Sequence, residues 1–109
     1  MLKQHETDLA VLSSELAFSF LSDAQMAARA IKNVTASPRL NFAILGNQEP
    51  HLHFHLIPRG GIGDVNPRKT PWESPLPKTD LSQDVVQKLT HEIRVGIGDQ
   101  SSRRLRNIY

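Results

Sequence analysis

Three histidines alternate with apolar residues in the stretch H-L-H-F-H-L-I at residues 51–57. The 109-residue chain has only five histidines, so this cluster is the part of the sequence best suited to chemistry. Successive side chains of a β-strand point to opposite faces, so His51, His53 and His55 are predicted to share one face. The residues between them are predicted to pack toward the core: Leu52, Phe54 and Leu56.

Three interpretations of this row of histidines remain open from the residues alone. One is a metal site, but alternate strand residues lie about 6.6 Å apart. Metal–nitrogen bonds are only about 2 Å long, so three such rings could share one ion only with strong distortion. The second is a polar surface without chemistry. The third, which we favour, is nucleophilic catalysis on phosphorus, because neutral imidazole is a competent nucleophile and neighbouring rings can donate protons.

The same residues carry a family resemblance. H-L-H-F-H-L-I matches the His-φ-His-φ-His-φ-φ motif of the histidine triad (HIT) superfamily of nucleotide hydrolases and transferases, where φ is a hydrophobic residue. The wider run L-N-F-A-I-L-G-N-Q-E-P-H-L-H-F-H-L-I-P-R resembles short bacterial HIT proteins, and the resemblance covers about residues 2–75. It implies an α+β fold in which helices pack on an antiparallel sheet.

The resemblance also implies roles for the three histidines. His53 would attack the α-phosphorus of a nucleotide and form a covalent nucleotidyl-histidine intermediate. His51 would orient and polarise His53, and His55 would bind the phosphate and the bridging oxygen. The implied substrates are dinucleoside polyphosphates, nucleoside phosphoramidates or adenylylated compounds. No cofactor or metal takes part, although a divalent cation could accompany a polyphosphate. The alternative is a HIT-like protein that binds nucleotides with little or no turnover.

Further residues are expected near the substrate. Asn47 and Gln48 lie where relatives carry side chains that touch phosphate oxygens, although simple turn chemistry also explains them. Asn41 is a third candidate for substrate binding. Trp72 resembles the Pro-Trp near the end of short HIT chains, and we expect it to pack against protein rather than to stack on substrate.

The elements that must position these residues follow from periodicity. An apolar face at helical spacing predicts a helix over residues 12–34, capped by Ser13 or Ser14. Apolar runs at 39–46 and 51–57 predict two strands of an antiparallel hairpin, the second of them ended by Pro58. A long loop rich in glycine and proline then follows.

The C-terminal part is predicted to form a second helix over residues 81–95, capped by Asp80. Gly96 and Gly98 are expected to end this helix, and residues 98–109 to form a flexible basic tail. Short relatives do not share this helix as a standard element, so we hypothesise that it covers an otherwise exposed surface. A single domain is thus expected over residues 1–97.

Relatives carry additional structure before the segment L-K-Q-H-E-T-D-L-A, so the resemblance implies a HIT-like domain shortened at its N-terminus. Unpaired sheet edges invite association, and a homodimer is therefore expected. The formal net charge of +2 gives no indication of nucleic-acid binding, and the sequence contains no cysteine. No apolar run approaches the roughly 20 residues that span a bilayer, so we expect a soluble cytoplasmic protein.

Overall fold

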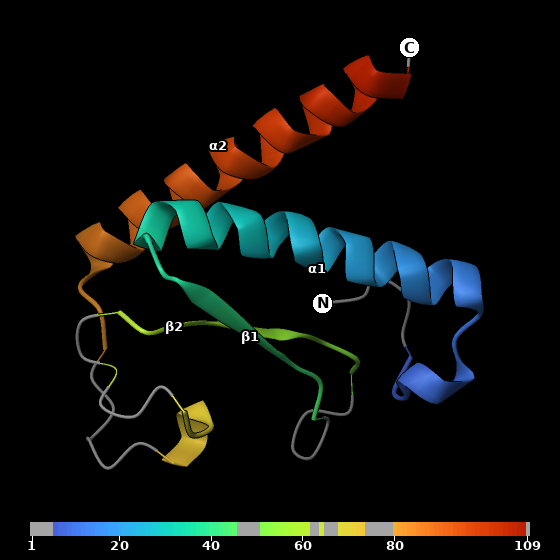
Figure 1. Ribbon diagram of the computed structural model, residues 1–109, viewed down its shortest axis with the longest axis horizontal. Coiled ribbons are helices and arrows are strands. Elements are labelled where there is room, and N and C mark those ends of the chain that lie inside the picture. The colour runs from blue at the N-terminus through green and yellow to red at the C-terminus, as the bar shows by residue number, and fades with distance from the viewer. Residues whose placement is uncertain (1–5, 46–50, 62–63, 65–67, 74–79, 109) are drawn as a thin grey trace.

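The computed structural model describes residues 6–45, 51–61, 64, 68–73 and 80–108, with side chains described as far as residue 100. Its elements, shown in Figure 1, are in chain order a 3-10 helix Leu9–Val11, α1 Ser14–Thr35, β1 Arg39–Ala43, β2 His55–Arg59, a 3-10 helix Pro71–Glu73 and α2 Gln83–Ile108. The two strands form an antiparallel sheet with α1 packed on it, which confirms the predicted α+β class.

α1 agrees with the helix predicted over residues 12–34. The backbone N–H of Leu16 donates to the Ser13 hydroxyl at 3.2 Å, so Ser13 is the N-cap. The helix ends where Ala36 takes a left-handed conformation, with φ of 53°. Pro38 follows two residues later and cannot continue a helix, which fixes where the chain turns toward β1.

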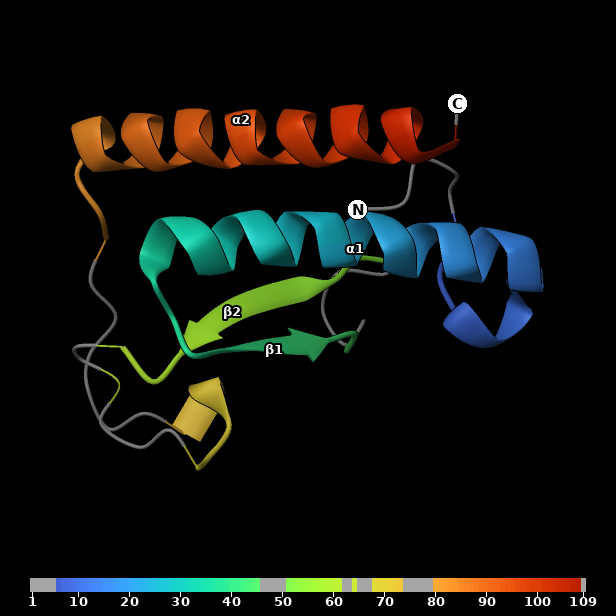
Figure 2. The same cartoon turned by 45° about the horizontal axis from the view of Figure 1, so that its top comes forward.

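The elements form three layers, with α1 between the sheet and α2 (Figure 2). Phe20 of α1 faces the sheet and forms the centre of the core together with Leu52. Small residues of α1, namely Ala24, Ala28 and Ala30, are also buried. The side of α1 that faces the sheet thus holds the histidine segment in place from behind.

The strand limits differ from those predicted. The register runs from Arg39 opposite Arg59 to Ala43 opposite His55, so β2 begins at His55 rather than at residue 51. Before His55 the backbone leaves the ladder, and the N–H of Leu52 donates instead to the Glu6 carbonyl at 2.8 Å. Pro58 does not end the strand but lies inside it. A proline is tolerated there because the described sheet has only two strands, and an edge strand needs no N–H on its open side.

α2 is longer than predicted. Ser82 caps it instead of Asp80, because the Val85 N–H donates to the Ser82 hydroxyl at 3.4 Å. The helix continues to Ile108 and passes through both glycines that were expected to end it. Residues 98–108, predicted as a flexible tail, are therefore helical, while the extent of the domain stays a prediction.

Contacts between α1 and α2 explain why Gly96 does not end the helix. A Cβ atom at Gly96 would lie 3.1 Å from the Cβ of Ala30, so the two helices approach closely at this point. Near it, the side-chain amide of Gln100 donates to the Met26 carbonyl at 2.8 Å. α2 thus covers the outer surface of α1. Within the described residues, no helix combines the length and apolar character needed to cross a bilayer.

Candidate active site

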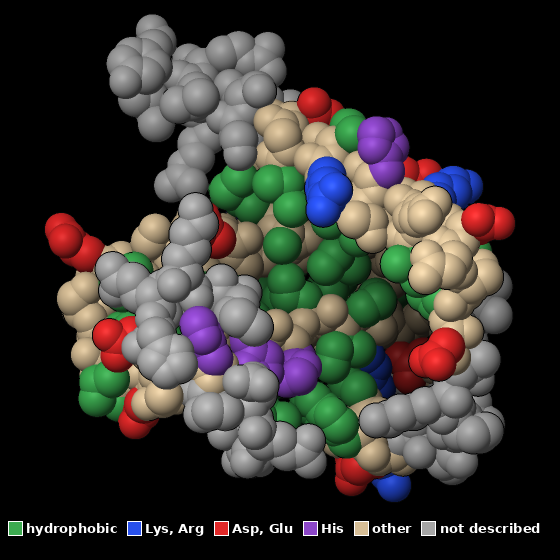
Figure 3. Space-filling model, turned by 180° about the vertical axis from the view of Figure 1, so that it is seen from behind, with side chains coloured by type: hydrophobic (Ala, Val, Ile, Leu, Met, Phe, Trp, Pro, Cys, Tyr) green, Lys and Arg blue, Asp and Glu red, His purple; other side chains and the backbone are tan. Residues whose placement is uncertain are grey.

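Two of the three histidine rings lie against each other. The rings of His53 and His55 meet at 67° with centroids 4.8 Å apart, and their Nε2 atoms are 3.1 Å apart. Both side chains are half-buried. Figure 3 shows histidine side chains in a row on the molecular surface beside an apolar hollow. The two facing nitrogens are therefore within hydrogen-bond distance of each other, on side chains that are partly exposed.

The backbone of His51 determines which nitrogen of His53 carries a proton. Nδ1 of His53 lies 2.7 Å from the carbonyl oxygen of His51. A carbonyl oxygen only accepts, so Nδ1 must be the protonated nitrogen and donate to it. In the neutral ring the lone pair then lies on Nε2, and Nε2 of His55 donates to it. The lone pair on Nε2 of His53 therefore points toward the ring of His55.

Apolar residues hold this segment from behind. Leu52 is only 3% exposed. The ring of Phe54 packs on the ring of Phe20 from α1, with centroids 4.7 Å apart, and also meets the edge of Phe42 at 6.2 Å. The alternation predicted from the sequence is therefore kept, although the ladder itself begins only at His55. His51 contacts the ring of His53 through its backbone carbonyl. That the His51 imidazole orients and polarises His53 stays a prediction.

Trp72 adds an aromatic wall next to the histidines. Its ring meets the ring of His55 nearly perpendicularly, at 87° with centroids 5.8 Å apart. The turn that carries it is closed by Glu73, whose carboxylate accepts from the N–H and the hydroxyl of Thr70 at 3.0 and 3.1 Å. Trp72 packs against protein as predicted, yet 51% of its surface is exposed. Part of the indole is thus available to a bound molecule.

Arg59 organises the far end of β2. It is only 4% exposed and forms a two-point contact with Asp64, at 2.9 Å from Nε and 3.3 Å from Nη2. Its Nη1 donates to the Asn41 side-chain oxygen at 2.6 Å, and the Gly60 N–H donates to Asp64 at 2.7 Å. Asn41, predicted to bind substrate, thus uses its amide oxygen to join β1 to β2.

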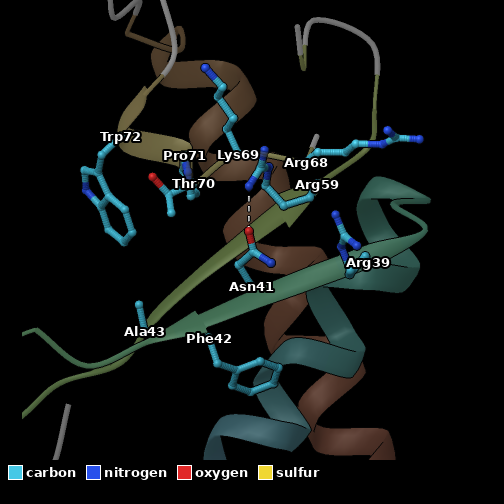
Figure 4. A pocket seen from close by; sticks show the side chains of 10 residues that line it. All are labelled: Arg39, Asn41, Phe42, Ala43, Arg59, Arg68, Lys69, Thr70, Pro71 and Trp72. Atoms are coloured by element: carbon cyan, nitrogen blue, oxygen red, sulfur yellow. Dashed lines mark hydrogen bonds between the residues drawn. The ribbon is translucent and has the colours of Figure 1, made fainter. Parts of the chain in front are cut away.

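A pocket of about 400 Å³ opens on the same side of the sheet (Figure 4). We name it the basic pocket, because four of its lining residues are cationic: Arg39, Arg59, Arg68 and Lys69. Asn41 and Trp72 line it as well. In Figure 4, Trp72 and Arg39 stand at opposite ends of the pocket, and Asn41 lies between them.

The remaining predicted residues are placed less fully. Asn47 and Gln48 lie outside the described residues, so their contact with substrate stays a prediction. In the described part of the chain, no three His, Cys, Asp or Glu side chains are grouped as metal ligands. Sequence reasoning missed Arg59, although its position continues the alternation of 51, 53 and 55 and so places it on the same face.

Comparison with known proteins identifies the fold. No family model and no curated protein matches the sequence. Among solved structures, a histidine triad protein from Bradyrhizobium japonicum is 25% identical, with a TM-score of 0.70. The match covers 87% of this chain and 69% of the Bradyrhizobium chain. Histidine triad proteins from Sinorhizobium meliloti 1021 and Marinobacter aquaeolei VT8 are 20% and 19% identical, with TM-scores of 0.72 and 0.71. They match 84% and 86% of this chain, and 66% and 67% of theirs.

These matches also reach the C-terminal helix. The residues before Gln83 make up only about three quarters of the chain, so a match over 84% or more extends into α2. The chain therefore has a histidine triad (HIT)-like fold, and it carries the alternating histidine motif on the segment that leads into β2.

Proposed function

We propose that this protein is a nucleotide hydrolase or nucleotidyltransferase in which His53 attacks the α-phosphorus of a nucleotide conjugate. The bond from His53 Nε2 to phosphorus forms as the bond from phosphorus to the leaving group breaks. Water, or another acceptor, then attacks the nucleotidyl-histidine, releases the nucleotide and regenerates the imidazole. The observation that carries the proposal is the 2.7 Å contact between His53 Nδ1 and the His51 carbonyl, because it leaves the Nε2 lone pair for attack.

The carbonyl contact supports the reaction in a second way. As Nε2 bonds to phosphorus, the imidazole of His53 gains positive charge, and a carbonyl oxygen next to Nδ1–H stabilises that charge. The ring is also held in one orientation, so less entropy is lost on reaching the transition state. Both effects require the backbone of His51, whatever its side chain adds.

His55 is placed to handle the proton of the leaving group. Its Nε2–H, which donates to His53 Nε2 at 3.1 Å, can turn its hydrogen bond to a phosphate or bridging oxygen when substrate binds. The leaving atom then departs protonated, which is most important for an amine. We infer that Asn47 and Gln48 contribute phosphate contacts from the neighbouring turn. A divalent cation could accompany a polyphosphate substrate.

We extend the proposal to a homodimer. In the described part of the chain the sheet has two strands, each with one unpaired edge, and Phe18 and Val11 are 72% and 68% exposed. Open edges and exposed apolar side chains favour association. Sedimentation equilibrium at micromolar concentration tests this, and a monomeric mass would remove it.

Turnover of a fluorogenic adenosine phosphoramidate tests the reaction. We expect His53→Ala to lower kcat/KM at least about a thousandfold, because the nucleophile is lost. His91→Ala is the matched control, since His91 is exposed on α2, on the other side of α1 from the sheet. Its kcat/KM should stay within about twofold of the wild type.

The covalent step has its own readout. Acid quenching with a nucleotide labelled at its α-phosphate should leave label on the wild type and none on the His53→Ala variant. Wild-type protein that binds the nucleotide without releasing product would favour the alternative of a binding protein. Equal turnover by wild type and His53→Ala would refute the assigned nucleophile.

A further inference from the structure

One peptide group of the histidine segment is hydrogen-bonded on both of its edges. Its N–H, from Leu52, donates to the Glu6 carbonyl at 2.8 Å. Its C=O, from His51, accepts from Nδ1 of His53 at 2.7 Å. A trans peptide is planar, and its N–H and C=O point in opposite directions. The Glu6 carbonyl and the ring of His53 therefore lie on opposite sides of one rigid group, and a contact that holds one edge orients the other.

The described sheet does not hold this peptide group. The ladder between β1 and β2 begins with the pair Ala43 and His55, so the residues just before His55 lie outside it. The buried side chain of Leu52 anchors the chain at this point, but the plane of the peptide could still rotate about the chain axis. Rotation would carry the His51 carbonyl away from the ring that it contacts. The hydrogen bond to Glu6 prevents this and takes the place of a ladder bond.

A short turn fixes the position of the Glu6 carbonyl. Asp8 caps the 3-10 helix that follows it, because its carboxylate accepts from the Ala10 N–H at 3.0 Å. Leu12, directly after that helix, packs against the core that includes Leu52. The segment that carries Glu6 is therefore anchored to the same core that supports the histidines.

The two hydrogen bonds also reinforce each other electrostatically. Hydrogen bonds that follow one another in a chain are polarised in the same direction, so a peptide whose N–H donates becomes a better acceptor at its C=O. The donation from Leu52 to Glu6 thus strengthens the bond that the His51 carbonyl accepts. A stronger acceptor at Nδ1–H of His53 favours the tautomer with its lone pair on Nε2. It also stabilises the positive charge that the ring gains on attack.

We propose that the Glu6 carbonyl positions the nucleophile: through the peptide between His51 and Leu52 it orients the ring of His53 and raises its reactivity. Glu6 acts through this peptide rather than on the reacting atoms, so it is a positioning residue and not a catalytic one. Only its backbone takes part, and its side chain is not required. The effect on turnover rests on the proposed function, whereas the effect on the His53 ring proton does not.

Exchange of one amide for an ester tests the coupling in the full-length chain. With Thr7 replaced by its α-hydroxy acid, the Glu6 carbonyl belongs to an ester, which is a weaker acceptor than an amide. We expect kcat for adenosine phosphoramidate to fall at least about threefold, the effect of weakening one neutral hydrogen bond, while KM stays within about twofold. The NMR signal of the His53 Nδ1 proton should move upfield, because its own hydrogen bond becomes weaker.

The matched control is the ester one residue later. Replacing Asp8 by its α-hydroxy acid weakens the Thr7 carbonyl instead, and no hydrogen bond of the described residues ends on that carbonyl. This ester keeps the capping carboxylate, so its kcat and its Nδ1 proton signal should match the wild type. Glu6→Ala keeps the carbonyl and should match it as well. Circular dichroism and thermal melting verify that each chain is folded.

The outcomes are distinguishable. If the Nδ1 proton signal of the Thr7 ester matches that of the control ester, the coupling between Glu6 and His53 is refuted, whatever kcat does. An upfield shift without a loss of kcat would overturn the positioning role, because the coupling would then not serve the attack. If the wild type does not turn over the phosphoramidate, the proposed function fails, and the proton signal alone decides on the coupling.

Discussion

Replacing Gly60 by alanine should destabilise the protein through one close contact. Gly60 follows β2 directly and has a φ of +81°, a conformation that residues with a Cβ rarely adopt. A Cβ atom there would lie 2.7 Å from Cγ and 3.4 Å from Cδ of Pro38. Pro38 is confined by its ring between α1 and β1, so it cannot move away without shifting the backbone that joins them.

The expected cost follows from three contributions. The positive φ costs about 1–2 kcal/mol for a residue with a Cβ. Relieving the contact with Pro38 costs about 1–2 kcal/mol more, as small-to-large changes in tightly packed places do. The lower entropy of the unfolded chain offsets about 0.4–1 kcal/mol. Gly60→Ala should therefore lower the free energy of unfolding by about 2 kcal/mol, and Tm by about 10 °C.

Gly61→Ala provides the matched control for this variant. A Cβ at Gly61 would meet nothing within 4 Å. We therefore expect its free energy of unfolding to stay within about 0.5 kcal/mol of the wild type. Urea unfolding followed by circular dichroism measures both variants. Equal midpoints for Gly60→Ala and Gly61→Ala would refute the reasoning, because they would mean that neither the φ nor the contact with Pro38 has an energetic cost.

Two other predictions concern the site and the helix contact. His51→Ala should lower kcat/KM for an adenosine phosphoramidate less than His55→Ala does, because the backbone carbonyl that orients the nucleophile remains. Steady-state kinetics measure both variants. A larger loss in His51→Ala would show that the His51 imidazole orients the nucleophile. Gly98→Ala should raise the free energy of unfolding by about 0.5–1 kcal/mol through helix propensity. Gly96→Ala should gain less, because its Cβ would crowd Ala30 at 3.1 Å; equal gains in thermal melts would contradict the close helix contact.

Local features of the sequence were sufficient to predict α1. Its cap, Ser13, bonds within the same turn, and its end depends on residues that come directly after it. Contacts of this kind involve neighbours in the chain, so composition and periodicity reveal them. The alternation around His53 is equally local, and for that reason the apolar residues between the histidines face α1 as predicted.

The first residue of β2 and the last residue of α2 could not be predicted from neighbouring residues in the chain. β2 begins where Ala43 is available as a partner, which depends on the register of the sheet rather than on the residues of the strand. Gly96 was expected to end a helix because glycine has low helix propensity. In the folded chain the missing side chain lets α2 approach Ala30, a residue far away in the sequence, and packing outweighs propensity.

The order of residues along the chain was enough to predict the row of histidines, its apolar support and the chemistry that imidazoles at this spacing can perform. These properties depend on the alternation of a single extended segment. Only the tertiary structure brought Trp72 against His55 and joined Arg59 to Asn41, 18 residues apart. It also gathered cations from β1, β2 and the following segment around one pocket. Such contacts depend on how separate segments are placed in space, and no local pattern of residues encodes that placement.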